Sequence, residues 1–155
     1  MDVQVVFDLE CGDGTLALAA AREYRANSVC VDGYSRRTGE VQKRVTSAHL
    51  DNRITVQLAD WRTLDISSAS VVVLFSPVQW DRSLRGHLTK QLRPGTRIVA
   101  WLRNLGSWAP AKVMMFQGTR DRHPIPVMLW IADGKYRPQE FAEAPAPSIP
   151  AFQFP

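Results

Sequence analysis

Three acidic side chains, each at the end of a short apolar run, are the first candidates for chemistry in this sequence. The runs are residues 3–9, 28–32 and 54–59, and the acids are Asp8, Asp32 and Asp60. Each run is typical of a buried strand. Ligands of open α/β sheets bind outside the carboxyl ends of the strands. The sequence therefore predicts one binding site that the three carboxylates share.

A glycine turn, "LECGDG", separates the first acid from a run of good helix formers. Gly12 and Gly14 would let a ligand come close to the backbone. A helix that begins at Thr15 would offer free N–H groups and the positive end of its dipole to an anionic group. Asp32 follows Gly14 by 18 residues, where a carboxylate can accept hydrogen bonds from both hydroxyls of a ribose.

The third acid is followed directly by an aromatic residue, Trp61, and this pair suits the amino group and ring of an adenine. Each residue alone also has a simpler interpretation. An acid at the end of a strand often caps the next helix, and a single Trp more often packs in the core. The three acids in this order favour an adenosine-containing ligand.

Strands and helices must alternate if these side chains are to meet at one edge of a sheet. Composition and spacing predict helices over residues 15–25, 38–50 and 83–92. Two more strands are predicted over residues 69–75, the most apolar stretch, and residues 96–102. This alternation indicates a mostly parallel sheet with right-handed crossovers.

The end of the chain changes character. Residues 113–119 and 127–132 are both strand-like, and the link "RDRHPIP" is too short for a crossover helix, so the two strands should pair antiparallel. The predicted fold is a three-layer Rossmann-like α/β sandwich whose seven-stranded sheet ends in an antiparallel hairpin. Five of the ten prolines fall between Pro138 and Pro155. We expect one domain at residues 1–136 and a Pro-rich C-terminal tail at residues 137–155.

The composition is that of a globular protein, with 45% hydrophobic and 22% charged residues. The net charge of +4 comes mainly from scattered arginines. Because basic segments that bind nucleic acid are usually clustered, a nucleic-acid partner is open but not favoured.

Cys11 and Cys30 lie in apolar stretches, and we expect both to be buried and reduced, as in an intracellular protein. No signal peptide and no apolar run of about 20 residues stands out, so the cytoplasm is the expected location. His49, His87 and His123 lack the spacing of metal ligands, and no metal is expected. The sequence indicates no oligomeric state.

The quoted motifs resemble those of the class I S-adenosylmethionine-dependent methyltransferases. In sequence order they are "VVFDLECGDGT", "VCVDGY", "LADWRTLD", "SVVVLFSPV" and "LRPGTRIVAW". Their spacing is most similar to that of small bacterial and archaeal protein-lysine methyltransferases, which are related to the mitochondrial enzyme that methylates the ATP synthase c subunit. The late segment "PVMLWIADGKY" also resembles that group, so the likeness covers about residues 3–136.

The resemblance implies S-adenosylmethionine as the cofactor and a protein lysine as the methyl acceptor. The implied cofactor-binding residues are Asp8, Leu9, Glu10, Gly12, Asp13, Gly14, Asp32, Gly33, Asp60 and Trp61. The first motif would surround the methionine part, Asp32 would bind the ribose, and Asp60 with Trp61 would flank the adenine. Ser76 and Pro77 would lie near the transferable methyl group as catalytic residues, and no metal would be needed.

Two departures from the motif pattern leave alternatives open. Glu10 stands where the first motif normally has a glycine. Its carboxylate could repel the cofactor carboxylate, attract the ammonium or sulfonium, or point outward as a surface group. The first strand also begins almost at Met1, whereas related enzymes carry an extra N-terminal segment. The alternatives are a methyltransferase-like binding scaffold with weak or no activity, and an RNA or small-molecule methyltransferase.

Overall fold

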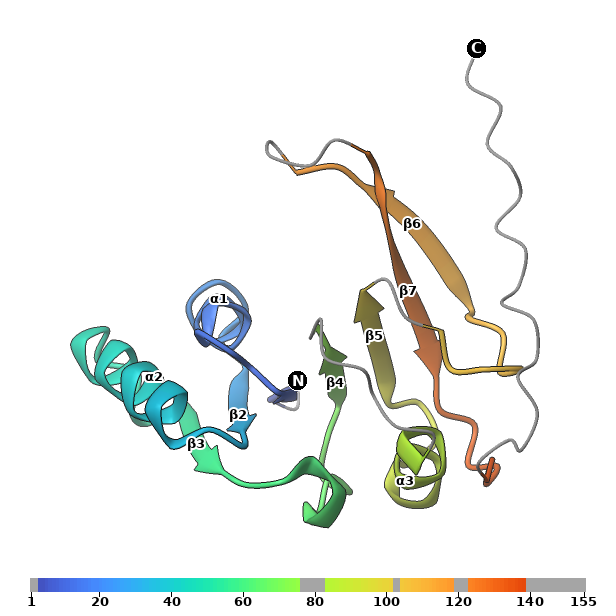
Figure 1. Ribbon diagram of the computed structural model, residues 1–155, viewed down its shortest axis with the longest axis horizontal. Coiled ribbons are helices and arrows are strands. Elements are labelled where there is room, and N and C mark those ends of the chain that lie inside the picture. Colours follow the sequence, from blue (N-terminus) through green and yellow to red (C-terminus); the bar gives the residue numbers. More distant parts are fainter. Residues whose placement is uncertain (1–2, 76–82, 102–103, 119–122, 139–155) are drawn as a thin grey trace.

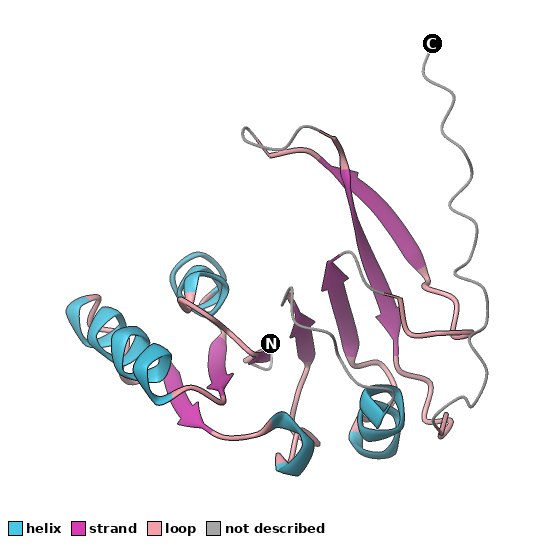
Figure 2. Ribbon diagram, in the orientation of Figure 1, coloured by secondary structure: helices cyan, strands magenta, loops and turns pink. Residues whose placement is uncertain are grey.

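The computed structural model describes residues 3–75, 83–101, 104–118 and 123–138, which form a seven-stranded sheet with helices on both faces (Figures 1 and 2). The strands are β1 (Val5–Leu9), β2 (Asn27–Asp32), β3 (Ile54–Leu58), β4 (Val71–Leu74), β5 (Arg97–Trp101), β6 (Lys112–Phe116) and β7 (Ile125–Ile131). The helices are α1 (Thr15–Tyr24), α2 (Ser35–Ser47) and α3 (Ser83–Gln91), with a 3₁₀ turn at Trp61–Thr63. The predicted three-layer α/β architecture is confirmed.

The strand order, β3-β2-β1-β4-β5-β7-β6, reverses at β1. β1 pairs in parallel with β2 on one side and with β4 on the other. β7 pairs antiparallel with β5, and β6 pairs antiparallel with β7, so the predicted closing hairpin is also confirmed. A reversal of strand order leaves a crevice at the carboxyl ends of the strands, which is the usual place for a ligand in such sheets.

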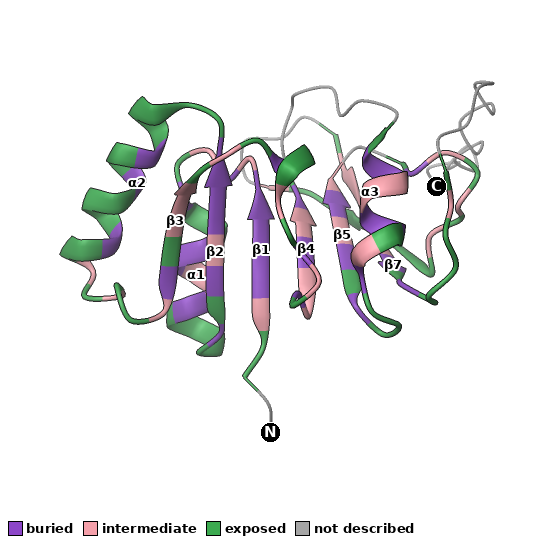
Figure 3. Cartoon of the chain, turned by 90° about the horizontal axis from the view of Figure 1, so that it is seen from below, coloured by how far each residue is buried: buried purple, intermediate pink, exposed green. Residues whose placement is uncertain are grey.

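The larger of the two cores lies between the sheet and α3, and Figure 3 shows this face with the buried residues in purple. Trp130 of β7, Ile98 of β5 and Leu88 of α3 are completely buried there. The indole Nε1 of Trp130 donates a hydrogen bond to the carbonyl of Trp108 at 2.7 Å. This bond satisfies the one polar group of a side chain that otherwise contributes only apolar area to the core.

The second core lies between α1, α2 and the strands β1, β2 and β3. It contains Cys11 and Cys30, which form a disulfide bond between the glycine turn and β2. The prediction that both side chains are buried is confirmed, but the prediction that they are reduced is wrong. Their Cα atoms are 5.4 Å apart, well inside the range that a disulfide can bridge. Only the fold brings the turn and the strand so close.

Neither α1 nor α2 extends over β4, β5, β7 and β6, and no other described helix covers these strands on the face of the sheet where α1 and α2 pack (Figure 1). Residues that pair across these strands point to the same face. They include Trp101, Val127 and Met114 on one level, where Phe75 stacks on Trp101, and Val73, Val99 and Leu129 on the next. Phe75 and Met114 are exposed by 44% and 55%, and Phe116 by 65%. We call these residues, with Ile131, the open apolar face.

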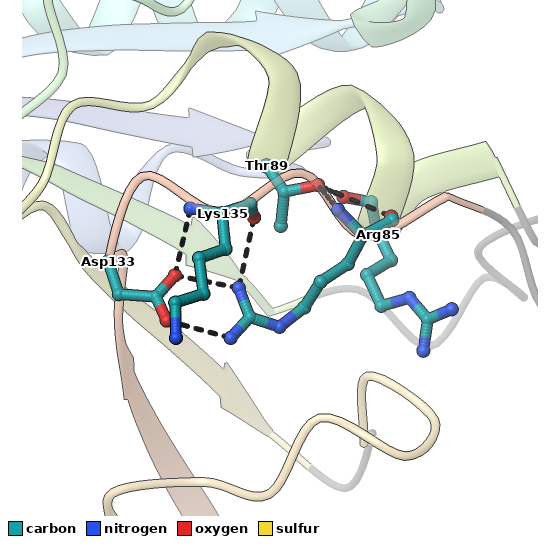
Figure 4. A network of polar contacts seen from close by, with 5 residues as sticks. Arg85, Thr89, Asp133 and Lys135 are labelled. Atoms are coloured by element: carbon teal, nitrogen blue, oxygen red, sulfur yellow. Dashed lines mark hydrogen bonds and ion pairs between the residues drawn. The ribbon is translucent and has the colours of Figure 1, made fainter.

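The chain beyond β7 is fastened to α3 by a polar network (Figure 4). The Arg137 guanidinium donates to both carboxylate oxygens of Asp133, and its backbone N–H donates to Thr89 Oγ1 of α3. These contacts hold the pKa of Asp133 well below its usual range, chiefly through the hydrogen bonds from Arg137. Arg85 of α3 adds a hydrogen bond to the carbonyl of Pro138.

The predicted elements are all present, with shifted ends. The largest shift is in α2, which was expected over residues 38–50 and is observed at Ser35–Ser47. Its first turn is stabilised because the Thr38 hydroxyl donates to the Ser35 carbonyl at 3.0 Å. His49 adopts a positive φ of 56°, which ends the helical course of the chain. In the described residues, no helix is long and apolar enough to cross a lipid bilayer.

Candidate functional site

A cavity of about 580 Å³ opens at the carboxyl ends of β1, β2 and β3. Glu10 lines it from the turn after β1, and Val31, Gly33 and Tyr34 line it from the end of β2. The third wall comes from the chain around the end of β3, Leu58 to Arg62. The volume falls within the range of small-molecule sites. The cavity lies on the edge of the sheet where the sequence predicts it.

The turn after β1 is built from positive φ angles, with values of 57° at Glu10, 59° at Gly12 and 74° at Gly14. Gly14 is required for a second reason, because a Cβ atom there would lie 2.6 Å from Val41 Cγ1 of α2. At Gly12 no atom lies within 4 Å of the position of a Cβ atom. The turn therefore packs closely against the protein at Gly14 and leaves the backbone open at Gly12.

In the segment "LECGDG", Asp13 and Leu9 have structural roles. The Asp13 carboxylate accepts hydrogen bonds from the backbone N–H and the hydroxyl of Thr15, at 3.0 and 2.9 Å, and so fixes the start of α1. The Leu9 side chain is completely buried in the core. Any contact of Leu9 with a ligand would therefore have to come from its backbone.

Asp8 is buried beneath the turn, with a relative exposure of 2%. Its Oδ2 atom has no hydrogen-bond partner among the described residues. Burial, followed by the negative charges of Asp13 and Asp32, raises the pKa of Asp8 to about 7. A buried carboxyl with an unused oxygen directly under an open turn is a group that a polar ligand could satisfy.

Asp32 links the turn to the end of β2. Its carboxylate accepts hydrogen bonds from the backbone N–H groups of Gly12, at 3.3 Å, and Tyr34, at 2.9 Å. Arg37 approaches the same carboxylate at 3.5 Å and covers the Tyr34 ring at 4.6 Å from its centre. Asp32 thus holds the turn and the end of β2 at a fixed distance from each other.

Asp60 and Trp61 line the cavity, but neighbouring side chains cover part of the surface that the sequence analysis assigned to adenine. Asp60 accepts hydrogen bonds from the backbone and the guanidinium of Arg62. The Trp61 side chain is only 3% exposed. Arg62 lies over its ring at 4.7 Å, and the His87 ring contacts it edge-on at 5.6 Å. Trp61 therefore supports the wall of the cavity more than it offers an open aromatic face.

Of the three predicted acids, only Asp60 lines the cavity itself. Asp8 and Asp32 lie directly under the turn, close enough for their charges to interact. Gly33 lines the cavity, and no atom lies within 4 Å of the position of a Cβ atom there. The proposed catalytic residues Ser76 and Pro77 lie outside the described residues.

Tyr34 and Arg62 are lining residues that the sequence reasoning did not select. Both stand directly beside a predicted site residue, Tyr34 after "VCVDG" and Arg62 after "ADW". Their position just past the end of a strand was the available signal, because the side chains at such positions face the ligand edge.

The arrangement fits an adenosine-containing cofactor. The cavity lies beside an open glycine backbone, and Asp32 at the end of β2 holds that backbone from beneath without lining the cavity itself. Asp8 adds a buried carboxyl whose Oδ2 lacks a partner among the described residues. The described residues contain no group of His, Cys, Asp and Glu side chains that could hold a metal ion.

Comparisons with known proteins agree with this assignment. The chain is 28% identical to a protein-lysine N-methyltransferase of Saccharolobus islandicus (strain REY15A) over 122 residues, which are 78% of this chain and 76% of the relative. It superposes with a TM-score of 0.74 and 26% identity on an RNA methyltransferase from Salinibacter ruber solved in complex with S-adenosyl-L-homocysteine, covering 86% of this chain and 84% of the other.

A more distant structure, the precorrin-6y C5,15-methyltransferase from Geobacter metallireducens GS-15, shares the fold with a TM-score of 0.67 at 11% identity, covering 86% of this chain and 81% of the other. The family model of the ANTKMT methyltransferase domain matches residues 8–112, which is more than half of the chain. The matched region contains the glycine turn, the cavity and the strands that carry them. This chain therefore belongs to the ANTKMT methyltransferase domain family and is an S-adenosylmethionine-dependent methyltransferase.

Proposed function

We propose that this methyltransferase acts on the lysine side chain of a protein. The observation that supports this acceptor is the relationship to a protein-lysine N-methyltransferase, which extends over 78% of the chain. The segment that matches the family model, residues 8–112, includes the turn, Asp32 and Asp60. The cofactor, when bound, supplies a methyl group whose bond to sulfur breaks as the lone pair of the amine attacks the carbon, which leaves a neutral thioether.

The described residues would bind and orient the cofactor. We assign the ribose hydroxyls to Asp32, which already fixes Gly12 and Tyr34 in place. The adenine would lie against the wall formed by Asp60 and Trp61. The open backbone at Gly12 and the buried Asp8 carboxyl would face the methionine part. Orientation of this kind is the main contribution that such a protein makes to an in-line transfer.

The acceptor side would lie past the ends of β4 and β5. Phe75 and Trp101 stack there, with ring centres 4.3 Å apart and planes inclined by 12°. A lysine must lose its proton before it can accept a methyl group, and apolar surroundings lower the pKa of an amine. The stacked pair supplies such surroundings directly before Ser76. We keep Ser76 and Pro77 as the proposed residues beside the transferable methyl group.

RNA is the second candidate acceptor, and two observations support it. The solved structure with 26% identity is named an RNA methyltransferase, and the chain carries a net charge of +4. The third alternative, a scaffold with little activity, rests on Glu10 in the turn. We also propose a cytoplasmic location, where reducing conditions would open the Cys11–Cys30 bond.

A labelling experiment separates these functions. The purified chain is incubated with S-adenosylmethionine that is labelled in the methyl group and with a cell lysate treated with ribonuclease or left untreated. We expect label in protein, unaffected by ribonuclease and recovered as methyl-lysine after hydrolysis. Label that disappears with ribonuclease would establish the RNA alternative. Cofactor binding without transfer to either class would support the scaffold. An Asp32→Asn variant, which should bind the cofactor poorly, serves as the negative control.

A further inference from the structure

The edge strand β6 exposes apolar side chains on both faces of the sheet. Val113 and Met115 are exposed by 50% and 49% on one face, and Met114 and Phe116 by 55% and 65% on the other. A strand with one face in water normally alternates apolar and polar side chains. β6 departs from this pattern along its whole length.

The strand at the other edge of the sheet, β3, shows the usual alternation (Figure 1). Ile54 and Val56 pack in the second core, and the polar Thr55 and Gln57 alternate with them. Edge strands are also commonly protected against pairing by charged residues or prolines. In β6 the only such residue is Lys112, at its start. β6 is therefore the edge of this sheet that is open to a further strand.

The backbone of β6 has unpaired groups on its outer side. Pro126 of β7 lies opposite Met115, and because proline has no N–H, these two residues cannot exchange a pair of hydrogen bonds. Hydrogen-bonded and non-hydrogen-bonded pairs alternate along an antiparallel ladder, so the N–H and carbonyl groups of Val113 and Met115 point away from β7. They have no backbone partner among the described residues.

We propose that two copies of this chain pair antiparallel along β6, so that the seven-stranded sheet of one copy continues into the other. A two-fold axis through Met114 gives the register in which every residue of the strand is paired. Val113 of one copy then lies opposite Met115 of the other, where their outward backbone groups can exchange hydrogen bonds. Because the same edge is used on both copies, the assembly closes at two.

The side chains of β6 are complementary to those of a second copy in this register. Val113 and Met115 cover each other on one face, and the two Met114 side chains meet on the other. Lys112 lies opposite Phe116, so the charge of each strand meets an aromatic ring and not its own counterpart. Pairing along the edge explains why both faces of β6 are apolar. A partner that covered only the open apolar face would leave Val113 and Met115 exposed.

The size of this interface predicts a weak dimer. A standard stable interface involves about 20–30 residues from each partner, whereas this one is centred on the five residues of β6. We therefore expect a dissociation constant on the order of 10–100 µM, at the weak end for specific complexes. The open apolar face stays uncovered in both copies, so any association through that face is a separate event.

Sedimentation velocity over a range of protein concentrations measures the dissociation constant. Val113→Pro removes an outward N–H and no hydrogen bond to β7, and an edge strand tolerates proline at such a position. Val113→Ile keeps this N–H and is the matched control. We expect Val113→Pro to weaken the dimer at least about tenfold, because an interfacial hydrogen bond is lost and the two backbones can no longer approach. Val113→Ile should stay within about twofold of the unchanged protein.

Two cysteine substitutions test the register. In the proposed dimer, two Met114→Cys chains bring their thiols together at the two-fold axis. Phe116→Cys lies on the same face of the same strand, but its thiol would be roughly 13 Å from that of the second copy, too far for a disulfide. We expect mild oxidation to link Met114→Cys chains into dimers and to leave Phe116→Cys chains unlinked. The two native cysteines are bonded to each other.

A chain that stays monomeric at the highest concentration would overturn the proposal. A dimer that Val113→Pro leaves unchanged would overturn it too. Equal cross-linking of Met114→Cys and Phe116→Cys would have the same meaning, because it would show contact without the proposed register. Thermal melts check that the variants are folded. If Val113→Pro does not fold, the two cysteine variants still decide the question.

Discussion

At the scale of single residues, Asp8 makes the stability of the fold depend on pH. Its pKa rises from 3.8 to about 7 in the folded chain, chiefly through burial. The folded state therefore keeps a proton that the unfolded chain loses, and this contribution is fully present below pH 4. It is lost as the pH rises toward 7. The shift corresponds to a loss of at most about 4 kcal/mol in the free energy of unfolding between pH 4 and pH 8.

We therefore expect Asp8→Asn, which keeps the shape without the charge, to be more stable than the unchanged protein at pH 8 and nearly equal to it at pH 4. Urea unfolding at several pH values checks this. Glu23→Gln, at an exposed carboxylate in the last turn of α1, should follow the unchanged protein at every pH. Parallel pH profiles for Asp8→Asn and the unchanged protein would show that Asp8 is ionised in both states.

The two glycines of the turn provide a second comparison between residues. Both have positive φ, but only Gly14 faces an atom that an added Cβ would strike, Val41 Cγ1 at 2.6 Å. Gly12→Ala should cost about 1–2 kcal/mol of stability from backbone strain alone. Gly14→Ala should cost about 1–3 kcal/mol more, because α2 must also move. Equal losses in chemical denaturation would contradict this packing.

At the scale of elements, the Cys11–Cys30 disulfide joins the turn after β1 to β2. The two cysteines are separated by 19 residues in sequence, and closing a loop of this size stabilises a fold by about 3 kcal/mol. Reduction should therefore lower the free energy of unfolding by about this amount. Thermal melts with and without a reductant measure it, and a Cys30→Ser variant should be insensitive to the reductant. Mass spectrometry of the unreduced chain that finds two alkylatable thiols would contradict the bond.

The elements also show how far the sequence alone could lead. The strands, the antiparallel hairpin and the position of the cavity were predictable, because apolar runs and the strand-end acids carry local signals. The disulfide was not, since it depends on how closely the turn approaches β2. The buried positions of Asp8 and Asp32 were missed for the same reason. The sequence places them at strand ends, and only the packing of the turn decides whether they line the cavity or lie below it.

The 3₁₀ turn at Trp61–Thr63 is a further example. "ADWRTLD" has no helical periodicity, and the turn forms because the Asp60 carboxylate accepts the N–H of Arg62 at 2.9 Å. This turn buries Trp61 against His87, whereas the sequence suggested an aromatic face open to adenine. A local hydrogen bond thus changes which side of an aromatic residue a ligand can reach.

At the scale of the whole molecule, the helices cover the two halves of the sheet unequally. α1 and α2 pack over β1, β2 and β3, whereas the open apolar face on β4, β5, β7 and β6 carries no helix among the described residues. This face continues from the stacked rings of Phe75 and Trp101 to the edge strand β6. Contiguous apolar surface of this kind commonly marks an interaction site or a tendency to associate. We therefore expect the exposed side chains of β6 to influence how the molecule associates in solution, whereas β7 also contributes the buried Trp130 to the core.

The edge strand β6 allows a matched test of this asymmetry. Met114 and Phe116 belong to the open apolar face, and Val113 and Met115, exposed by 50% and 49%, point to the opposite face of the same strand. Met114→Lys with Phe116→Lys should reduce the binding of a hydrophobic dye clearly and improve solubility. Val113→Lys with Met115→Lys should change both much less. Each pair should alter stability by no more than about 0.5 kcal/mol per substitution, because these side chains are at the surface. Equal effects on dye binding would mean that the exposed strand, and not the continuous face behind it, determines the association of this protein.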